Sequence, residues 1–173
     1  SLGLFVQSHQ HAQVPEGIPF RHRLHAGVLS HLIGADPERL REELGCMIAD
    51  AASGAIFADP AFADVPVGLR TIRDIAFSGD GEPTTCKHFR ECVEIAAALK
   101  REAGLTETKI VLITDACYLT KPDVVAGLAI MDAHHGEIWA KLDAGTEEYY
   151  QLVNRPNYPL GHVIDNIIAA ARV

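Results

Sequence analysis

The hydrophobic and polar positions divide the chain into an irregular first part and a regular second part. From residue 74 onward, three mostly apolar runs at residues 74–78, 109–114 and 137–143 are each followed by a helical pattern or by a turn that leads to one. Strand and helix units of roughly 30 residues are typical of βα repeats. The second run is apolar almost throughout, as in parallel strands that are covered on both faces. The pattern therefore predicts an α/β fold built on a parallel sheet or a barrel.

Capping and stop residues mark the expected helices. Asp36 can cap a first helix, Pro37 suits its first turn, and Gly54 is a plausible stop. The apolar stripe of this helix comprises Leu40, Leu44, Met47 and Ile48, and Cys46 lies on or beside it as an expected small core residue. Further helices are expected over residues 85–103, from about residue 120, and over residues 160–171.

Residues 1–31 show no clear period, apart from one short expected strand at residues 4–7. Five of the nine histidines lie in this part of the chain: His9, His11, His22, His25 and His31. Imidazole suits zinc, nickel or copper, yet no carboxylate or thiolate stands beside these histidines at a recognised ligand spacing. A metal site and an ordinary irregular segment both remain open.

Composition narrows the class of protein. With 173 residues and 48% hydrophobic content the chain fits one domain with a sizeable core. Its net charge of -8 argues against nucleic acid as a partner of this segment, because such binders usually carry a basic face. No apolar run reaches the roughly 18 residues of a membrane span, and no signal-peptide pattern opens the chain. Four cysteines show no disulfide-framework density, so we expect a cytoplasmic protein.

Polar residues follow each of the three strands. Ligands bind at the carboxyl ends of the strands in both parallel sheets and barrels, so residues 78–83, 114–117 and 141–144 should converge on one mouth. The first of these segments holds two glycines and a proline, which let the backbone approach a small polar ligand closely. An ordinary βα turn is the alternative interpretation of this segment.

Lys141 and Asp143 flank Leu142, so on one strand their side chains point to the same face. They either pair with each other or with sheet neighbours, or they hydrogen-bond a bound polar ligand. Asp115 and Glu82 are further candidates at this edge, although an Asp after a strand often caps the next helix.

Four segments then carry a resemblance to a known family. Residues 77–84, Phe-Ser-Gly-Asp-Gly-Glu-Pro-Thr, resemble the glycine-glutamate-proline segment after the second strand of radical S-adenosylmethionine enzymes. Residues 112–116 resemble the third-strand segment often written threonine-asparagine-glycine, and residues 140–144 resemble the fourth-strand leucine-aspartate-alanine segment. Residues 146–156 are similar to the branch related to the wyosine-base-forming tRNA enzymes, also labelled iron-sulfur oxidoreductases. The resemblance covers about residues 69–171.

The resemblance implies a partial (β/α) barrel with about four of the family's six βα units, in one domain over residues 1–173 with its core repeats at 69–173. Such an incomplete barrel would leave an apolar sheet edge, so we expect association with itself or with another chain. The family binds S-adenosylmethionine and cleaves its sulfonium with a [4Fe-4S] cluster, giving a 5'-deoxyadenosyl radical that acts on a substrate.

The resemblance also implies site residues. Backbone groups of Ser78, Gly79, Asp80, Gly81 and Glu82 would hold the amino group of S-adenosylmethionine. Thr114, Asp115, Lys141 and Asp143 would lie near its ribose and carboxylate, and Asn154 and Arg155 would help to shape the site.

The chain departs from the family at the cluster. The three ligands spaced Cys-x3-Cys-x2-Cys are absent, either in a natural variant or through loss of that segment. Cys86 and Cys92 follow the glycine-rich segment and lie six residues apart on an expected helix, where about 100° per residue puts them off a common face. They therefore cannot replace the triplet.

Three hypotheses remain open from the sequence. The first is a radical S-adenosylmethionine domain that is incomplete or inactive as it stands. The second is a cluster-less relative that binds S-adenosylmethionine or a nucleotide, or that is only a structural remnant. The third is a βα-barrel lyase using Lys141 as a Schiff-base amine, although Asp143 beside it would keep the ammonium charged.

Overall fold

The computed structural model describes residues 3–7, 36–78 and 81–172. Its strands are β1 (Gly3–Gln7), β2 (Asp74–Phe77), β3 (Lys109–Thr114) and β4 (Gly136–Lys141). Its α-helices are α1 (Pro37–Ser53), α2 (Phe89–Glu102), α3 (Pro122–Ala133), α4 (Glu147–Asn154) and α5 (Leu160–Ala170). Short 3-10 helices are η2 (Ala55–Ala58), η3 (Val67–Leu69) and η4 (Pro83–Thr85). Gly79, Asp80 and the five histidines of the first part lie outside the described residues.

The four strands form one parallel sheet in the order β1-β4-β3-β2. The α/β class and the parallel sheet expected from the apolar runs are thereby confirmed, as is the short strand near the start of the chain. Strands β2, β3 and β4 are neighbours in chain order. Strand β1, however, pairs with β4 and not with β2.

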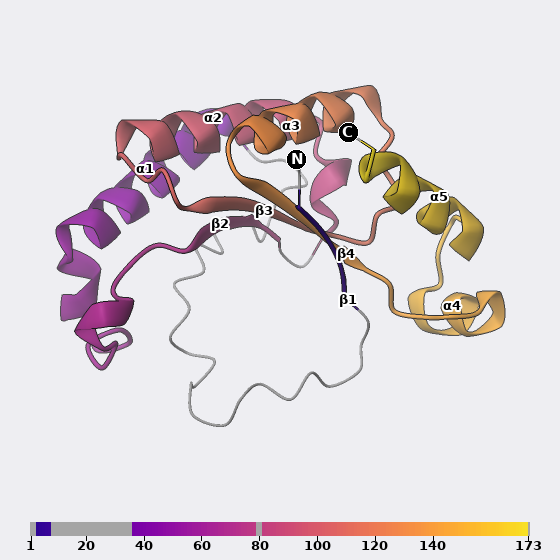
Figure 1. The fold of residues 1–173 in the computed structure, drawn as a ribbon, viewed down its shortest axis with the longest axis horizontal. Coiled ribbons are helices and arrows are strands. Elements are labelled where there is room, and N and C mark those ends of the chain that lie inside the picture. The colour runs from indigo at the N-terminus through magenta and orange to yellow at the C-terminus, as the bar shows by residue number, and fades with distance from the viewer. Residues whose placement is uncertain (1–2, 8–35, 79–80, 173) are drawn as a thin grey trace.

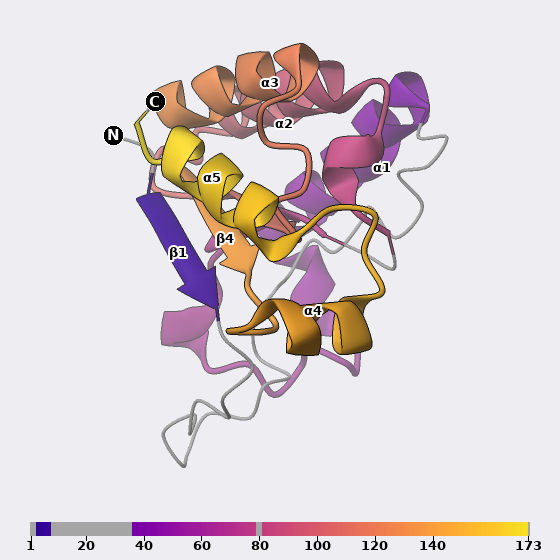
Figure 2. The same ribbon diagram turned by 90° about the vertical axis from the view of Figure 1, so that its right-hand side faces the viewer.

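Helices α1, α2 and α3 lie together on one face of the sheet (Figure 1), where α1 packs against α2 and α2 against α3. Ile110, Leu112, Ile138 and Ala140 belong to the buried core and, from the alternation along a strand, share one face. Ile113, Trp139 and Lys141 therefore lie on the opposite face. Figure 2 shows α4 beyond the carboxyl end of β4, with α5 running back alongside the sheet.

The helix start at Asp36 is confirmed. Its Oδ1 accepts a hydrogen bond of 3.1 Å from the Glu38 amide, and Gly54 ends α1 with a φ of 82°. The prediction that Cys46 belongs to the core is wrong, because its side chain is exposed. Cys46 lies two residues from both Leu44 and Ile48, a rotation of about 200° around the helix, so it faces away from their stripe.

Two further boundaries differ from the sequence prediction. Strand β4 ends at Lys141, two residues before the expected end at Asp143. Helix α2 begins at Phe89, after η4 and a short turn, so Cys86 is not on the helix. The rotation of about 100° per residue consequently does not separate Cys86 from Cys92. Their thiols are in fact hydrogen-bonded to each other.

Replacing Asp36 by Ala should lower the free energy of unfolding by about 1 kcal/mol, because the first turn of α1 loses its side-chain cap. Chemical denaturation followed by circular dichroism measures this change. Asp50→Ala, in the last turn of the same helix, is the matched control and should not destabilise, since a carboxylate is unfavourable near a helix C-terminus. Equal losses in the two variants would contradict the capping role.

Candidate functional site

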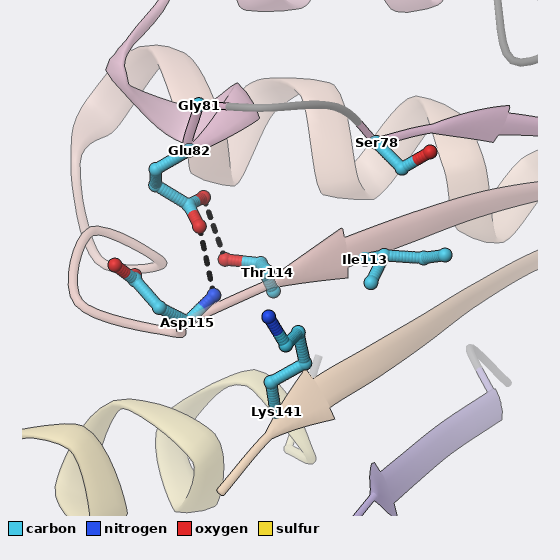
Figure 3. A pocket seen from close by; sticks show the side chains of 7 residues that line it. All are labelled: Ser78, Gly81, Glu82, Ile113, Thr114, Asp115 and Lys141. Carbon is cyan, nitrogen blue, oxygen red and sulfur yellow. Dashed lines mark hydrogen bonds between the residues drawn. The ribbon is translucent and has the colours of Figure 1, made fainter. Parts of the chain in front are cut away.

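A cavity of about 220 Å³ lies at the carboxyl ends of β2, β3 and β4. It is lined by Ser78, Gly81, Glu82, Ile113, Thr114, Asp115 and Lys141 (Figure 3). The expectation that the three strand ends converge on one mouth agrees with this arrangement, since each strand end contributes lining residues. Two of the lining side chains are carboxylates and one is an ammonium.

Glu82 connects two of these strand ends. Its Oε1 accepts hydrogen bonds from the Thr84 amide (3.0 Å) and the Thr114 hydroxyl (2.7 Å), and also from the Thr84 hydroxyl. Its Oε2 accepts one hydrogen bond, from the Asp115 amide at 2.7 Å. The three donors at Oε1 share its two lone pairs, whereas Oε2 has one donor and keeps a lone pair for a ligand.

Local structure explains the position of Glu82. It is the N-cap residue of η4, and Pro83 follows as the first residue of that turn, where its missing N–H is not needed. The pKa of the Glu82 carboxyl lies above its ordinary value of 4.5. Burial is the largest cause, because it disfavours the charged form, and repulsion by the nearby Asp115 carboxylate is the next. This carboxylate therefore gains from a cation placed beside it.

Lys141 is the last residue of β4, and its side chain is exposed. Figure 3 shows its amino group reaching from β4 towards Thr114. Within residues 3–7, 36–78 and 81–172, no hydrogen bond or ion pair engages this ammonium. The cavity thus has an acidic side formed by Glu82 and Asp115 and an uncommitted cation opposite.

The turn after β3 holds Thr114 and Asp115 in place. The Asp115 carboxylate accepts a hydrogen bond of 2.9 Å from the Cys117 amide, as expected for an Asp that follows a strand. The Thr114 hydroxyl accepts one of 3.0 Å from the Ala116 amide. Ala116 has a φ of 62°, in the left-handed region that favours glycine.

Helix α5, near the end of the described chain, is hydrogen-bonded to this turn. Asn166 is 3% exposed, and its Nδ2 donates to the carbonyls of Ala116 and Cys117, each at 2.9 Å. Its Oδ1 accepts from the Thr120 hydroxyl at 3.2 Å. The sequence analysis missed this contact, and the available signal was a lone amide within the apolar pattern of residues 160–171.

Replacing Asn166 by Ala should lower the free energy of unfolding by about 2 kcal/mol, because the Ala116 carbonyl loses its side-chain donor and the Cys117 carbonyl keeps only the contact with His162. Thermal and chemical denaturation of the variant measure this loss. Asn157→Ala, at an exposed amide in the loop before α5, is the control and should change little. A similar stability for both variants would show that the hydrogen bonds of Asn166 do not stabilise the turn.

Three of the sequence-predicted site residues do not line the cavity. Asp143 lies beyond the end of β4, so strand alternation with Lys141 does not apply, and its Oδ2 accepts from the Asn154 side chain at 2.9 Å. Arg155 is exposed and ends α4 in the left-handed conformation, with a φ of 46°. The hydrogen bond between Asp143 and Asn154 therefore joins the segment after β4 to the end of α4.

The thiols do not converge on the cavity. Cys86 is hydrogen-bonded to Cys92, Cys117 lies 3.8 Å from the Tyr150 hydroxyl, and Cys46 is exposed on α1. Among the described residues, no group of three or more His, Cys, Asp and Glu side chains is arranged to hold a metal ion. These residues consequently do not fit the three-cysteine cluster site that the family resemblance implies.

Within residues 3–7, 36–78 and 81–172, no helix is both long and apolar enough to cross a membrane.

The arrangement of the cavity matches a small zwitterion. An ammonium would lie beside Glu82 and Asp115, and a carboxylate would lie beside Lys141.

No protein family, curated protein or solved structure matches this chain.

Proposed function

We propose that this chain is a domain of the radical S-adenosylmethionine type, related to the wyosine-base-forming branch, that binds S-adenosylmethionine without cleaving it by itself. The observation that carries the proposal is the hydrogen-bonded Glu82 carboxylate facing the Lys141 ammonium, which has no partner among the described residues, across one cavity. The amino group of S-adenosylmethionine binds beside Glu82, and its carboxylate binds beside Lys141.

The size and charge of the cavity support this ligand. Pockets that enclose a whole drug-sized ligand measure about 300–1,000 Å³, so the 220 Å³ here suits one end of such a molecule. Two carboxylates against one ammonium leave the lining net negative, which attracts the cationic sulfonium ligand. The amino acid end of S-adenosylmethionine therefore enters the cavity, and the nucleoside end extends from it.

Backbone conformation at the motifs adds support. Ala116 occupies the position at which the resembling third-strand segment has glycine, and its φ of 62° is a conformation that glycine adopts freely. Glu82 and Pro83, the residues that resemble the family's glutamate-proline pair, begin η4 and face β3. Strands β2, β3 and β4 are adjacent in chain order, as in a (β/α) barrel, whereas the pairing of β1 with β4 departs from that order.

Because the cysteine triplet is absent, we do not propose that this chain cleaves S-adenosylmethionine. Reductive cleavage of the sulfonium needs the cluster, and the residues present do not hold one, so no radical step is included. We also propose a cytoplasmic location, which the four free thiols support because a reducing compartment preserves them.

Two other functions have less support. Nucleotides carry negative phosphates, and the lining offers two carboxylates against one ammonium, so charge disfavours them. A Schiff-base lysine needs a desolvated amine, whereas the Lys141 side chain is exposed.

Isothermal titration calorimetry tests the proposed ligand. We expect saturable binding of S-adenosylmethionine by the full chain, with a Kd of about 1–100 μM. S-adenosylhomocysteine lacks the sulfonium charge and should bind more weakly, and ATP should not compete. Heat from ATP alone would favour the nucleotide alternative, and no heat from any of the three would leave only the structural remnant.

A further inference from the structure

Two thiols lie in contact outside the cavity. Cys86 ends the turn η4, and Cys92 lies in the first turns of α2. The Cys92 thiol is hydrogen-bonded to the sulfur of Cys86, and both side chains belong to the core that joins α2 to the sheet. In the proposed S-adenosylmethionine site neither thiol lines the cavity, so this pair has no role there.

The two thiols have different surroundings. The Cys86 sulfur precedes the N-terminus of α2 and accepts a hydrogen bond of 3.4 Å from the His88 amide. The hydrogen bond from Cys92 lowers the pKa of the Cys86 thiol most, the His88 amide adds to this, and burial opposes it. The pKa of the Cys92 thiol is raised, first by the hydrogen bond it shares with Cys86 and then by burial. When one thiol of the pair ionises, Cys86 is therefore the favoured thiolate, and Cys92 keeps its proton.

Access to solvent follows the same asymmetry. Cys86 keeps 6% of its surface exposed, whereas Cys92 has none. A small oxidant therefore reaches Cys86 first. Cys117 is a poor competitor, since burial and the nearby Asp115 raise the pKa of its thiol to about 11.

We propose that Cys86 and Cys92 form a redox-active dithiol, which hydrogen peroxide converts into an intramolecular disulfide. This inference does not rest on the proposed ligand of the cavity.

The reaction has two balanced steps. The Cys86 thiolate attacks one oxygen of hydrogen peroxide, the O–O bond breaks, and hydroxide leaves, so Cys86 becomes a sulfenic acid. The Cys92 sulfur then attacks the Cys86 sulfur, the S–O bond breaks, and the leaving hydroxide takes the Cys92 proton to form water. Overall the two thiols lose two electrons and two protons, and one peroxide becomes two waters.

Peptide mapping tests the dithiol in the full chain. Trypsin cleaves after Lys87 and Arg90, so the disulfide would link the separate peptides 74–87 and 91–100. We expect mass spectrometry of the peroxide-treated, alkylated chain to detect this linked pair, and dithiothreitol to release it. Cys86 should lose its free thiol at least about tenfold faster than Cys117. Faster oxidation of Cys117, or no linked peptides once Cys86 is consumed, would overturn the proposal.

Variants distinguish the two roles. With Cys92→Ser, dimedone should trap a sulfenic acid on Cys86, because the second thiol is gone. With Cys86→Ser, Cys92 should stay unmodified over the same time. Cys46→Ser removes the exposed thiol and should leave the linked peptides unchanged, which excludes a bridge between two chains through Cys46. Dimedone on Cys92 in the Cys86→Ser variant would contradict the assigned order, and circular dichroism checks that each variant is folded.

Discussion

Replacing Glu82 by Ala should lower the free energy of unfolding by about 3 kcal/mol. Four donors lose their acceptor at once: the amide and hydroxyl of Thr84, the hydroxyl of Thr114 and the amide of Asp115. Unsatisfied buried donors cost about 1–3 kcal/mol each, and their effects do not add fully within one network. The segment after β2 would also lose its connection to β3.

Chemical denaturation of three variants and the wild type measures this effect. Glu82→Gln keeps one acceptor oxygen and should be destabilised less than Glu82→Ala. Glu102→Ala, at an exposed position in the last turn of α2, is the control and should stay within about 0.5 kcal/mol of the wild type. If Glu82→Ala is as stable as the control, the carboxylate does not join the two strand ends.

Glu82 should also make ligand binding depend on pH. Its raised folded-state pKa means that the folded chain holds this proton more tightly than the unfolded chain. The resulting stabilisation is complete below the ordinary value of 4.5 and is lost as pH rises through the folded-state pKa. A ligand ammonium prefers the ionised carboxylate, so affinity for S-adenosylmethionine should rise over the same window. Calorimetry from about pH 5 upward should show this rise in the wild type and a weaker one in Glu82→Gln.

Replacing Lys141 by Met should weaken S-adenosylmethionine binding by about 10- to 100-fold. The ligand carboxylate would lose its partner ammonium, and hydrogen bonds to charged groups contribute about 1.5–3 kcal/mol. The fold should be unaffected, because no hydrogen bond or ion pair engages Lys141 within the described residues.

Calorimetry compares this variant with two controls. Lys141→Arg keeps a cation at the cavity and should retain most of the affinity. Lys87→Met removes an exposed ammonium away from the cavity lining and should bind like the wild type. Wild-type affinity in Lys141→Met would remove Lys141 from the site, whereas an equal loss of affinity in Lys141→Met and Lys87→Met would indicate only long-range charge.

Local signals account for the part of the fold that the sequence predicted. Strand β3 has the expected bounds of residues 109–114, because an unbroken apolar run between polar residues defines both of its ends. Asp36 and Pro37 predict the start of α1. The Asp36 side chain accepts a hydrogen bond from a free amide of the first turn, and Pro37 has no amide proton that needs a partner. Both signals lie within a few residues of the element that they define.

Features that depend on distant contacts were not predictable. Helix α4 has only eight residues, and Tyr149, Leu152 and Val153 are exposed while Tyr150 is buried, so no buried stripe marked it. Pairing of β1 with β4 joins segments more than 130 residues apart, and no pattern within either strand specifies its neighbour.

In the candidate site, too, local signals were predictable and distant contacts were not. The rule that parallel strands carry ligands at their carboxyl ends was enough to collect Ser78, Glu82, Thr114, Asp115 and Lys141, all of which line the cavity. It failed for Asp143, because the strand ends two residues earlier than its apolar pattern. The hydrogen bonds to Glu82 from Thr114 and Asp115 and the contacts of Asn166 span 32 to 50 residues, so only the folded chain reveals them.

We propose that the amino acid end of S-adenosylmethionine binds between Glu82 and Lys141. Titration of the 15N-labelled chain with S-adenosylmethionine, followed by amide chemical shifts, tests this most directly. We predict saturable shifts at Gly81, Thr84, Asp115 and Lys141, with none in α1, and the same pattern at reduced size with free methionine. Unchanged shifts at these four residues on saturation, or shifts confined to another part of the chain, would contradict the account.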